Sequence, residues 1–199
     1  VMGHHEGSFL LSANNSRLLS SEPGAWTFVT MSDEYMLGGT YTGLVLYRKE
    51  KGQWVFDRKL DGLKESCRIM VKDEDQSIWI SHPYRGVYNV RWNAGNKDKI
   101  DIRFFNQENG LPTNLNNYVF QIAGKAVFAT EKGVFHFDRS KDTFVPDDDF
   151  NRLLDKQHRV RYLREDTKGN VWYVTDHEAG MLIVNDFGLK KEVRKKVIP

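Results

Sequence analysis

The chain has 199 residues, of which 40% are hydrophobic and 28% are charged, a composition that excludes a disordered or a membrane-embedded chain. No apolar run approaches the roughly 20 residues that a membrane-spanning helix needs. The 29 basic and 27 acidic residues nearly cancel, and so balanced a charge gives little support to nucleic-acid binding. We therefore expect a folded segment that binds no nucleic acid.

Neither cysteine content nor the N-terminus places the chain in a cellular compartment. Cys67 is the only cysteine, so no disulfide can form within the chain. It lies in a strand-like run, where we expect a buried thiol rather than a reactive one. The chain begins at Val1 without a visible signal peptide, and we interpret it as a segment of a longer protein.

After two short predicted strands at 7–11 and 17–19, four segments of the chain share one layout. Each has an apolar strand that ends in Thr or Ser, a short turn, a glycine and a second apolar strand. A glycine at this point suits a hairpin that needs a positive φ. These glycines are Gly43, Gly86, Gly133 and Gly180, which lie 43, 47 and 47 residues apart. Such even spacing is close to the roughly 40–50 residues of a propeller blade.

Each repeat also has one strand on either side of this hairpin. The upstream strands are expected at 26–30, 68–71, 118–122 and 160–163, and the downstream strands at 53–56, 101–105, 143–145 and 189–193. Four short antiparallel strands in each repeat are typical of a propeller blade. A helical turn is expected only near 150–156.

The sequence therefore predicts an all-β fold, a β-propeller fragment of four four-stranded antiparallel blades and a partial N-terminal blade. The partial blade is expected at 7–20 and the four blades at 26–60, 67–106, 117–146 and 159–193. The partial blade lacks partner strands, and the six residues after Val193 cannot supply two strands. We therefore interpret residues 1–199 as one segment of a larger propeller. Its open blade edges favour self-association, because unpaired strand edges bind other chains.

Large apolar residues recur in the second strand of the repeats. Trp79 and Trp172 take the same place in their blades, Phe128 takes it in the third blade and Leu37 takes it in the first. We expect these side chains to wedge between neighbouring blades. Truncation of either Trp is then expected to destabilise the fold by about 3–5 kcal/mol.

The repeat resembles the two-component regulator propeller family, whose repeat combines a Gly-Leu-Pro entry with a Trp-Ile-Gly-Thr core. The segment Asn109-Gly-Leu-Pro-Thr-Asn114 matches the entry, and segments 76–81 and 168–175 match the core. Three blades depart from the pattern: segment 125–130 lacks the Trp, the first blade matches more loosely still, and the last blade lacks the Gly-Leu-Pro entry.

This resemblance implies a sensor. Propellers of this family usually form the periplasmic part of hybrid histidine kinases or of membrane-bound transcription regulators in bacteria, and many govern polysaccharide use. The resemblance therefore implies a periplasmic signal-transduction segment of an inner-membrane protein, with a kinase or DNA-binding output elsewhere in the parent chain. The expected ligand is a glycan or similar nutrient, or a peptide.

Propeller ligands commonly bind over one face of the ring, near the central opening. The turns between the second and third strands line such a face, together with the linkers between blades. Six turn residues are candidate ligand-binding residues: Tyr41, His82, Tyr84, Arg85, Lys132 and His177. The longer turn at 82–85 is the first candidate, because a rigid aromatic ring beside an arginine is the usual composition of an interface anchor.

The sequence contains no motif of an activated nucleophile, a phosphate-binding loop or a metal site. We therefore expect no catalytic residue, no metal and no cofactor in this segment. Two other interpretations stay open, a protein-interaction scaffold of the WD or kelch type and a propeller lyase or glycosidase. The enzyme would need two carboxylates, or a histidine and a carboxylate, that converge at the ring centre.

Overall fold

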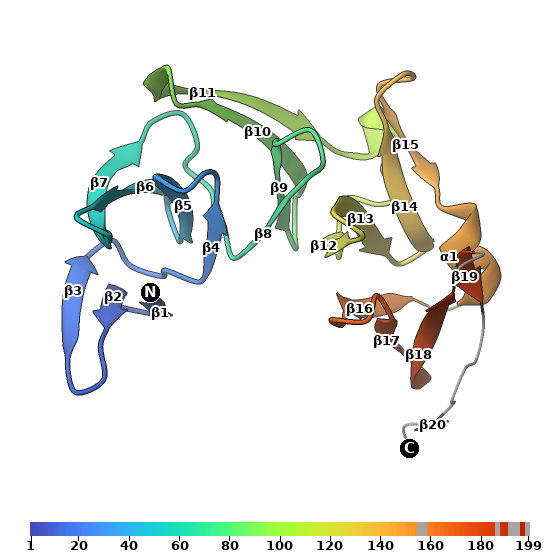
Figure 1. The fold of residues 1–199 in the computed structure, drawn as a ribbon. Helices are drawn as coiled ribbons and strands as arrows, with labels where there is room; N and C mark the ends of the chain where they lie inside the picture. The colour runs from blue at the N-terminus through green and yellow to red at the C-terminus, as the bar shows by residue number, and fades with distance from the viewer. Residues whose placement is uncertain (155–158, 186–187, 191–195, 198–199) are drawn as a thin grey trace.

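The computed structural model describes residues 1–154, 159–185, 188–190 and 196–197, and these form five antiparallel β-sheets. Figure 1 shows the sheets following one another along an open arc, with the first and fifth sheets at its two ends. The prediction of an all-β chain is confirmed, and the arrangement of the sheets is propeller-like. The described residues contain no helix long and apolar enough to cross a membrane.

The strands follow the order of the chain. The first sheet contains β1 (Met2–His4), β2 (Gly7–Leu11) and β3 (Ser16–Ser20). The second contains β4 (Thr27–Thr30), β5 (Tyr35–Thr40), β6 (Gly43–Glu50) and β7 (Gln53–Leu60). The third contains β8 (Ile69–Lys72), β9 (Ile78–His82), β10 (Gly86–Asn93) and β11 (Asn96–Phe105).

A 3₁₀ turn, η1 (Gln107–Asn109), leads to the fourth sheet, which contains β12 (Tyr118–Ile122), β13 (Lys125–Thr130), β14 (Gly133–Asp138) and β15 (Thr143–Pro146). Helix α1 (Asp148–Leu153) follows, close to the expected helical turn. The fifth sheet contains β16 (Val160–Glu165), β17 (Val171–Thr175), β18 (Glu178–Asn185) and β19 (Gly188–Lys190), and β20 (Lys196–Val197) also pairs with β18. The last strand was expected at 189–193, of which 191–193 lie outside the described residues.

Within the second to fifth sheets, the four main strands pair in chain order. The first strand of each of these sheets lies on the inside of the arc and the fourth lies on the outside (Figure 1). In an antiparallel sheet of this order, the turn from the second to the third strand and the linker to the next sheet emerge at the same end. This end of the sheets therefore collects loops from every repeat.

The first sheet has one strand more than the sequence predicted. Strand β1 pairs with β2 from Met2 opposite Phe9 to His4 opposite Gly7, so the expectation that the strands of the 7–20 segment lack a partner is wrong. Three residues that include Gly3 and His4 show no apolar alternation, which explains why the pattern missed this strand.

The sheets pack face to face, and an apolar layer fills each interface. Between the second and third sheets lie Leu37, Leu46, Ile78, Ile80 and Val90. Between the third and fourth lie Trp79, Phe105, Phe128 and Phe144, and between the fourth and fifth lie Val127, Val134, Phe150, Val171 and Tyr173. Side chains alternate between the two faces of a strand, so each inner sheet contributes apolar residues to both of its neighbours.

Cys67 belongs to the layer between the second and third sheets. Burial, with a smaller contribution from the Glu65 carboxylate, raises the pKa of its thiol to about 12. The expectation of a buried and unreactive thiol is consistent with this position, because the thiolate is the reactive form.

Trp79 is the centre of the layer between the third and fourth sheets and is 1% exposed. Its ring centroid lies 5.4, 5.1 and 5.7 Å from those of Phe105, Phe128 and Phe144. Such edge and tilted contacts add to the free energy of area burial. The predicted wedge between neighbouring sheets is confirmed for Trp79.

A buried carboxylate joins the same two sheets beside this ring. Asp73 accepts a hydrogen bond from Trp79 Nε1 at 3.0 Å within the third sheet. From the fourth sheet it accepts the backbone N–H of Ala126 at 2.9 Å and Nη2 of Arg139 at 2.5 Å. Because buried charges need such partners, Asp73 fixes how the fourth sheet sits on the third.

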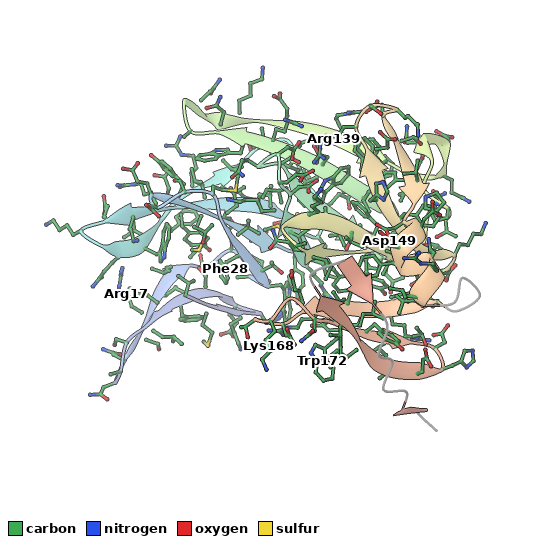
Figure 2. All side chains as sticks on the ribbon, turned by 45° about the vertical axis from the view of Figure 1, so that its right-hand side comes forward. Arg17, Phe28, Arg139, Asp149, Lys168 and Trp172 are labelled. Atoms are coloured by element: carbon green, nitrogen blue, oxygen red, sulfur yellow. The ribbon has the colours of Figure 1, made fainter. Side chains whose placement is uncertain are left out.

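Trp172 has the place of Trp79 in the fifth sheet, but no described sheet lies against it, so the predicted wedge is not formed in this chain. It is 51% exposed, although its Nε1 donates to Asp166 at 3.3 Å as that of Trp79 donates to Asp73. Trp79 faces the next sheet along the chain, whereas Trp172 lies on the face of the fifth sheet that no described sheet covers (Figure 2).

Phe128 lies between neighbouring sheets, as predicted, but it does not take the place of Trp79 in its sheet. It faces back towards Trp79, and Val127 instead faces the fifth sheet. The longer turn after β9 caused the error, because His82, rather than Ser81, pairs with the turn glycine as Thr130 pairs with Gly133. A slip of one residue exchanges the two faces of a strand.

These positions predict very different costs for two matched substitutions. Trp79→Ala should lower the free energy of unfolding by about 3–5 kcal/mol, because it opens a cavity in a closed aromatic layer. Trp172→Ala should cost about 1 kcal/mol or less in this chain, because its ring is half exposed. Urea unfolding followed by circular dichroism measures both. Equal costs for the two variants would contradict the structure.

Candidate functional site

The turns between second and third strands lie beside the segments that lead into the first strands. Backbone N–H groups of Tyr41, Asn116 and Asp176 donate to the carbonyls of Pro23, Pro83 and Arg159, at 3.1, 2.9 and 3.2 Å. We call this end of the sheets the turn face. It comprises the turns 41–42, 83–85, 131–132 and 176–177 and the lead-in segments 22–26, 61–68, 114–117 and 159.

Three of the four turns are held by a threonine at the end of the second strand. The hydroxyls of Thr40 and Thr130 donate to the carbonyls of Gly43 and Gly133 at 2.9 and 2.8 Å. These glycines have φ of 126° and 104°, which other residues rarely adopt. The short turns therefore present few side chains to a ligand. Lys132 is an exposed side chain on one of these turns.

The turn of the third sheet is longer and gathers three of the predicted residues around one carboxylate. Nη1 of Arg85 lies 2.5 Å from Oε1 of Glu65, and Nε2 of His82 lies 3.8 Å from Oε2. The rings of His82 and Tyr84 are 6.2 Å apart, and Tyr84 is 74% exposed. Glu65, His82, Tyr84 and Arg85 thus form one cluster with an aromatic ring facing solvent.

The charges of this cluster act on His82 in opposite directions. Burial lowers the pKa of His82 below its usual value, the Glu65 carboxylate raises it, and the Arg85 guanidinium lowers it. The imidazole is therefore favoured in its neutral form, which has one donor and one acceptor nitrogen.

Tyr41 belongs to a second cluster, where the second sheet meets the third. Its hydroxyl lies 3.1 Å from Nδ1 of His5, and its ring centroid lies 5.9 Å from that of Trp26. Cζ of Arg68 lies 5.1 Å from the Tyr41 ring centroid and 5.4 Å from that of Trp26. The cluster thus combines two aromatic rings with a guanidinium that lies over both.

The sequence carried a signal for this second cluster that the motif search did not use. Trp26 and Arg68 both stand directly before the first strand of a sheet, as do Asn117 and Arg159. Because each first strand lies on the inside of the arc, the residue before it belongs to the inner rim of the turn face. The repeat position alone therefore predicts that Trp26 and Arg68 lie at this inner rim, although their residue types differ.

The two remaining predicted residues lie farther along the turn face. Lys132 and His177 are exposed on the turns of the fourth and fifth sheets. Nearby, Glu131 accepts a hydrogen bond from Asn116 Nδ2 at 2.8 Å, and Arg161 pairs with Asp176. Of the six predicted residues, the structure therefore gathers His82, Tyr84 and Arg85 into one cluster and places Tyr41 in another.

Buried polar atoms without a partner are also concentrated on the turn face. In the described part of the chain these atoms are Ser66 Oγ, Ser81 Oγ, Asn117 Oδ1 and Arg159 Nε. Ser66, Asn117 and Arg159 come from lead-in segments, and Ser81 lies at the end of β9. Because buried polar atoms are normally hydrogen-bonded, these four atoms mark the part of the structure where polar groups are least completely paired.

A cavity of about 480 Å³ lies away from the turn face, between the fourth and fifth sheets. His136 and Asp147 line it with Nδ1 and Oδ2 3.3 Å apart. The described residues that line this cavity include no hydroxyl or thiol side chain, and its cations Lys125 and Arg139 already pair with carboxylates. Nowhere in the described ranges do three or more His, Cys, Asp or Glu residues converge as metal ligands.

Comparison with known proteins identifies the fold but no close relative. No family model matches the chain. No curated protein matches it in sequence. Two structures of the extracellular domain of BT4673 from B. thetaiotaomicron are similar, one described as a proposed one-component system and one as a proposed hybrid two-component system.

Both similarities have a TM-score of 0.65, with 17% and 16% sequence identity over 95% and 96% of this chain. The chain spans only 25% of each of those chains. A catalytically inactive virginiamycin B lyase variant from Staphylococcus aureus, solved with quinupristin, has a TM-score of 0.54 at 12% identity, over 93% of this chain and 59% of that chain. At these identities the comparisons show a shared fold.

The cluster around Glu65 predicts opposite effects of two substitutions on His82. Glu65→Gln should lower the pKa of His82 further, because it removes the charge that favours the imidazolium. Arg85→Gln should raise it, because it removes a repelling cation. Titration of the His82 ring resonances by NMR, assigned with His82→Asn, measures both shifts. Shifts of the same sign would contradict this geometry.

Proposed function

We propose that this chain is part of the ligand-sensing propeller of a bacterial signalling protein and that its turn face binds an oligosaccharide or a peptide. The observation that carries the proposal is the clustering of exposed aromatic, guanidinium and imidazole groups on that face. Aromatic rings and arginines are the usual anchors of binding sites. The resemblance of the repeats to the two-component regulator propeller family supports a sensing role, as does the shared fold with an extracellular domain.

The same resemblance supports a periplasmic location in a protein anchored to the inner membrane, with a kinase or transcription-regulating output elsewhere in the parent chain. We propose no nucleic-acid contact and no cofactor for this segment.

We also propose that the sheets are blades of a larger propeller, with four complete blades and a partial one at the N-terminus. Trp172 supports this, because it is exposed at the position where Trp79 is buried against the next sheet. A further blade in the parent protein would cover that face. In the isolated chain, the same face and the open sheet edges favour self-association.

We propose that the segment has no catalytic activity. Among the described residues, the His136–Asp147 pair comes from β14 and the start of α1, away from the inner rim of the arc where propeller ligands commonly bind. The acids that line the nearby cavity are held by structural hydrogen bonds, as Asp73 is by Trp79 and Ala126. These observations favour a binding segment over a lyase or a glycosidase.

Substitutions in the turn of the third sheet test the binding function. Tyr84→Ala and Arg85→Ala should each weaken ligand binding by about 2 kcal/mol, because anchor side chains carry most of the energy of an interface. Both should change stability by less than about 0.5 kcal/mol, because the two side chains are exposed. Calorimetry against a panel of oligosaccharides and peptides measures affinity, and melting curves measure stability.

Lys168→Ala is the matched control, because Lys168 is exposed on the β16–β17 turn, away from the turn face (Figure 2). Unchanged affinity in both Tyr84 and Arg85 variants would place the site elsewhere. Release of product from any bound oligosaccharide would overturn the non-enzymatic assignment.

A further inference from the structure

Trp26, Tyr41 and Arg68 form a preorganised cluster on the turn face. The Tyr41 ring rests against Gly24, where an added Cβ would lie 2.4 Å from ring atoms. The backbone N–H of Tyr41 donates to Pro23 at 3.1 Å, and its hydroxyl lies 3.1 Å from His5 Nδ1. The Tyr41 residue is therefore held at its backbone, at its ring and at its hydroxyl.

The backbone at Arg68 is fixed by contacts between the second and third sheets. Its carbonyl accepts a hydrogen bond from Thr27 Oγ1 at 2.5 Å, and the N–H of Cys67 donates to Thr40 at 2.9 Å. An added Cβ at Gly39 would lie 2.0 Å from the Cys67 carbonyl oxygen, so the two sheets approach closely here. The Arg68 side chain therefore starts from a backbone that is held rigidly between the two sheets. Its guanidinium lies over the rings of Trp26 and Tyr41.

Arg68 differs from most other arginines of the chain in having no carboxylate partner. Ion pairs with carboxylates hold Arg48, Arg85, Arg91, Arg103, Arg139 and Arg161. Within the part of the chain that the structure describes, Arg68 forms no ion pair, and it is exposed. A guanidinium presents five N–H donors in a planar fork that matches a carboxylate. The donors of Arg68 are therefore accessible to an anion from solvent.

Trp26 provides an exposed apolar surface beside this cation. Its indole is 47% exposed and lies next to Arg68, whose Cζ is 5.4 Å from the ring centroid. The negative face of an aromatic ring attracts C–H groups, and the flat side of a pyranose presents several of them. Because the guanidinium lies over one face of the indole, a ligand ring would pack against the exposed remainder of Trp26, next to the anion-binding fork.

We propose that Trp26, Tyr41 and Arg68 form a subsite for an acidic sugar unit, with a uronate ring stacked on Trp26 and its carboxylate bound by Arg68. Tyr41 acts as the fixed platform that orients the guanidinium. This inference rests on the proposed glycan-binding function and narrows it to acidic glycans. A peptide of acidic residues alone would satisfy the guanidinium but has no ring to pack on Trp26, so the pair of groups favours the sugar.

Calorimetry on the 199-residue chain tests the subsite, with trimers of galacturonate, glucuronate and mannuronate and their neutral counterparts as probes. The acidic trimers should bind about tenfold or more tightly than the neutral ones, because charge-assisted hydrogen bonds are roughly twice as strong as neutral ones. Arg68→Gln should abolish this preference. Affinity for the acidic trimers should also fall as salt is raised, because salt screens exposed charges.

Trp26 and a control arginine separate stacking from charge. Trp26→Ala should weaken acidic and neutral trimers alike, and Trp26→Phe should retain part of the affinity because it keeps a ring. Arg17→Gln is the matched control, because Arg17 is an exposed arginine of the first sheet, away from this cluster (Figure 2). Circular dichroism and melting curves establish that each variant is folded.

Three outcomes would overturn the acidic subsite. They are equal affinity for acidic and neutral trimers, a preference that survives Arg68→Gln, and tighter binding of a triaspartate peptide than of every uronate trimer. If Tyr84→Ala and Arg85→Ala still weaken binding of neutral trimers or peptides, the proposed sensing function stands and only this subsite fails.

Discussion

The stacking of one apolar sheet face on the next is the interaction on which the rest of this structure depends. Each inner sheet is apolar on both faces, so no sheet can bury its own core, and burial comes only from its neighbours. Trp79 shows this dependence, because its ring is enclosed by residues of the fourth sheet as well as of its own. Trp172 has the same place in its sheet and remains half exposed, because no described sheet covers that face.

This stacking also explains where the proposed binding groups lie. The faces of the sheets pack against neighbouring sheets, and the fourth strands form the outer side of the arc. Loops therefore emerge only at the two ends of the sheets. At the turn face, the contacts that hold sheets together also fix candidate binding groups. Thr27 and Gly39 bring the second sheet against the backbone at Cys67 and Arg68, and this places Arg68 over Trp26 and Tyr41. A rigid scaffold with polar groups at one end is a common arrangement for recognition.

The sequence predicted the strands well because their signals are local. The turn glycines and the apolar runs on both sides of them identified nearly every main strand within a few residues. Gly180 is the exception among the glycines, because it lies inside β18 opposite Tyr173 and does not begin the strand. The face of each side chain was less predictable. Phe128 was aligned with Trp79 although Val127 has that place, because a longer turn shifted the register by one residue. Trp172 was expected to be buried, but no described sheet covers it. The turn cluster of His82, Tyr84 and Arg85 was found from residue types, whereas Trp26 and Arg68 are 42 residues apart and meet only through packing.

Hydrogen–deuterium exchange of the backbone amides tests the central claim that stability comes from sheet-to-sheet burial. Paired amides of β9, β10 and β13 should exchange slowest, because their sheets are covered on both faces. Amides of β2 and β17, in the two end sheets, should exchange faster, because local opening there exposes less apolar surface. Uniform protection across the five sheets, or slowest exchange in an end sheet, would contradict the account.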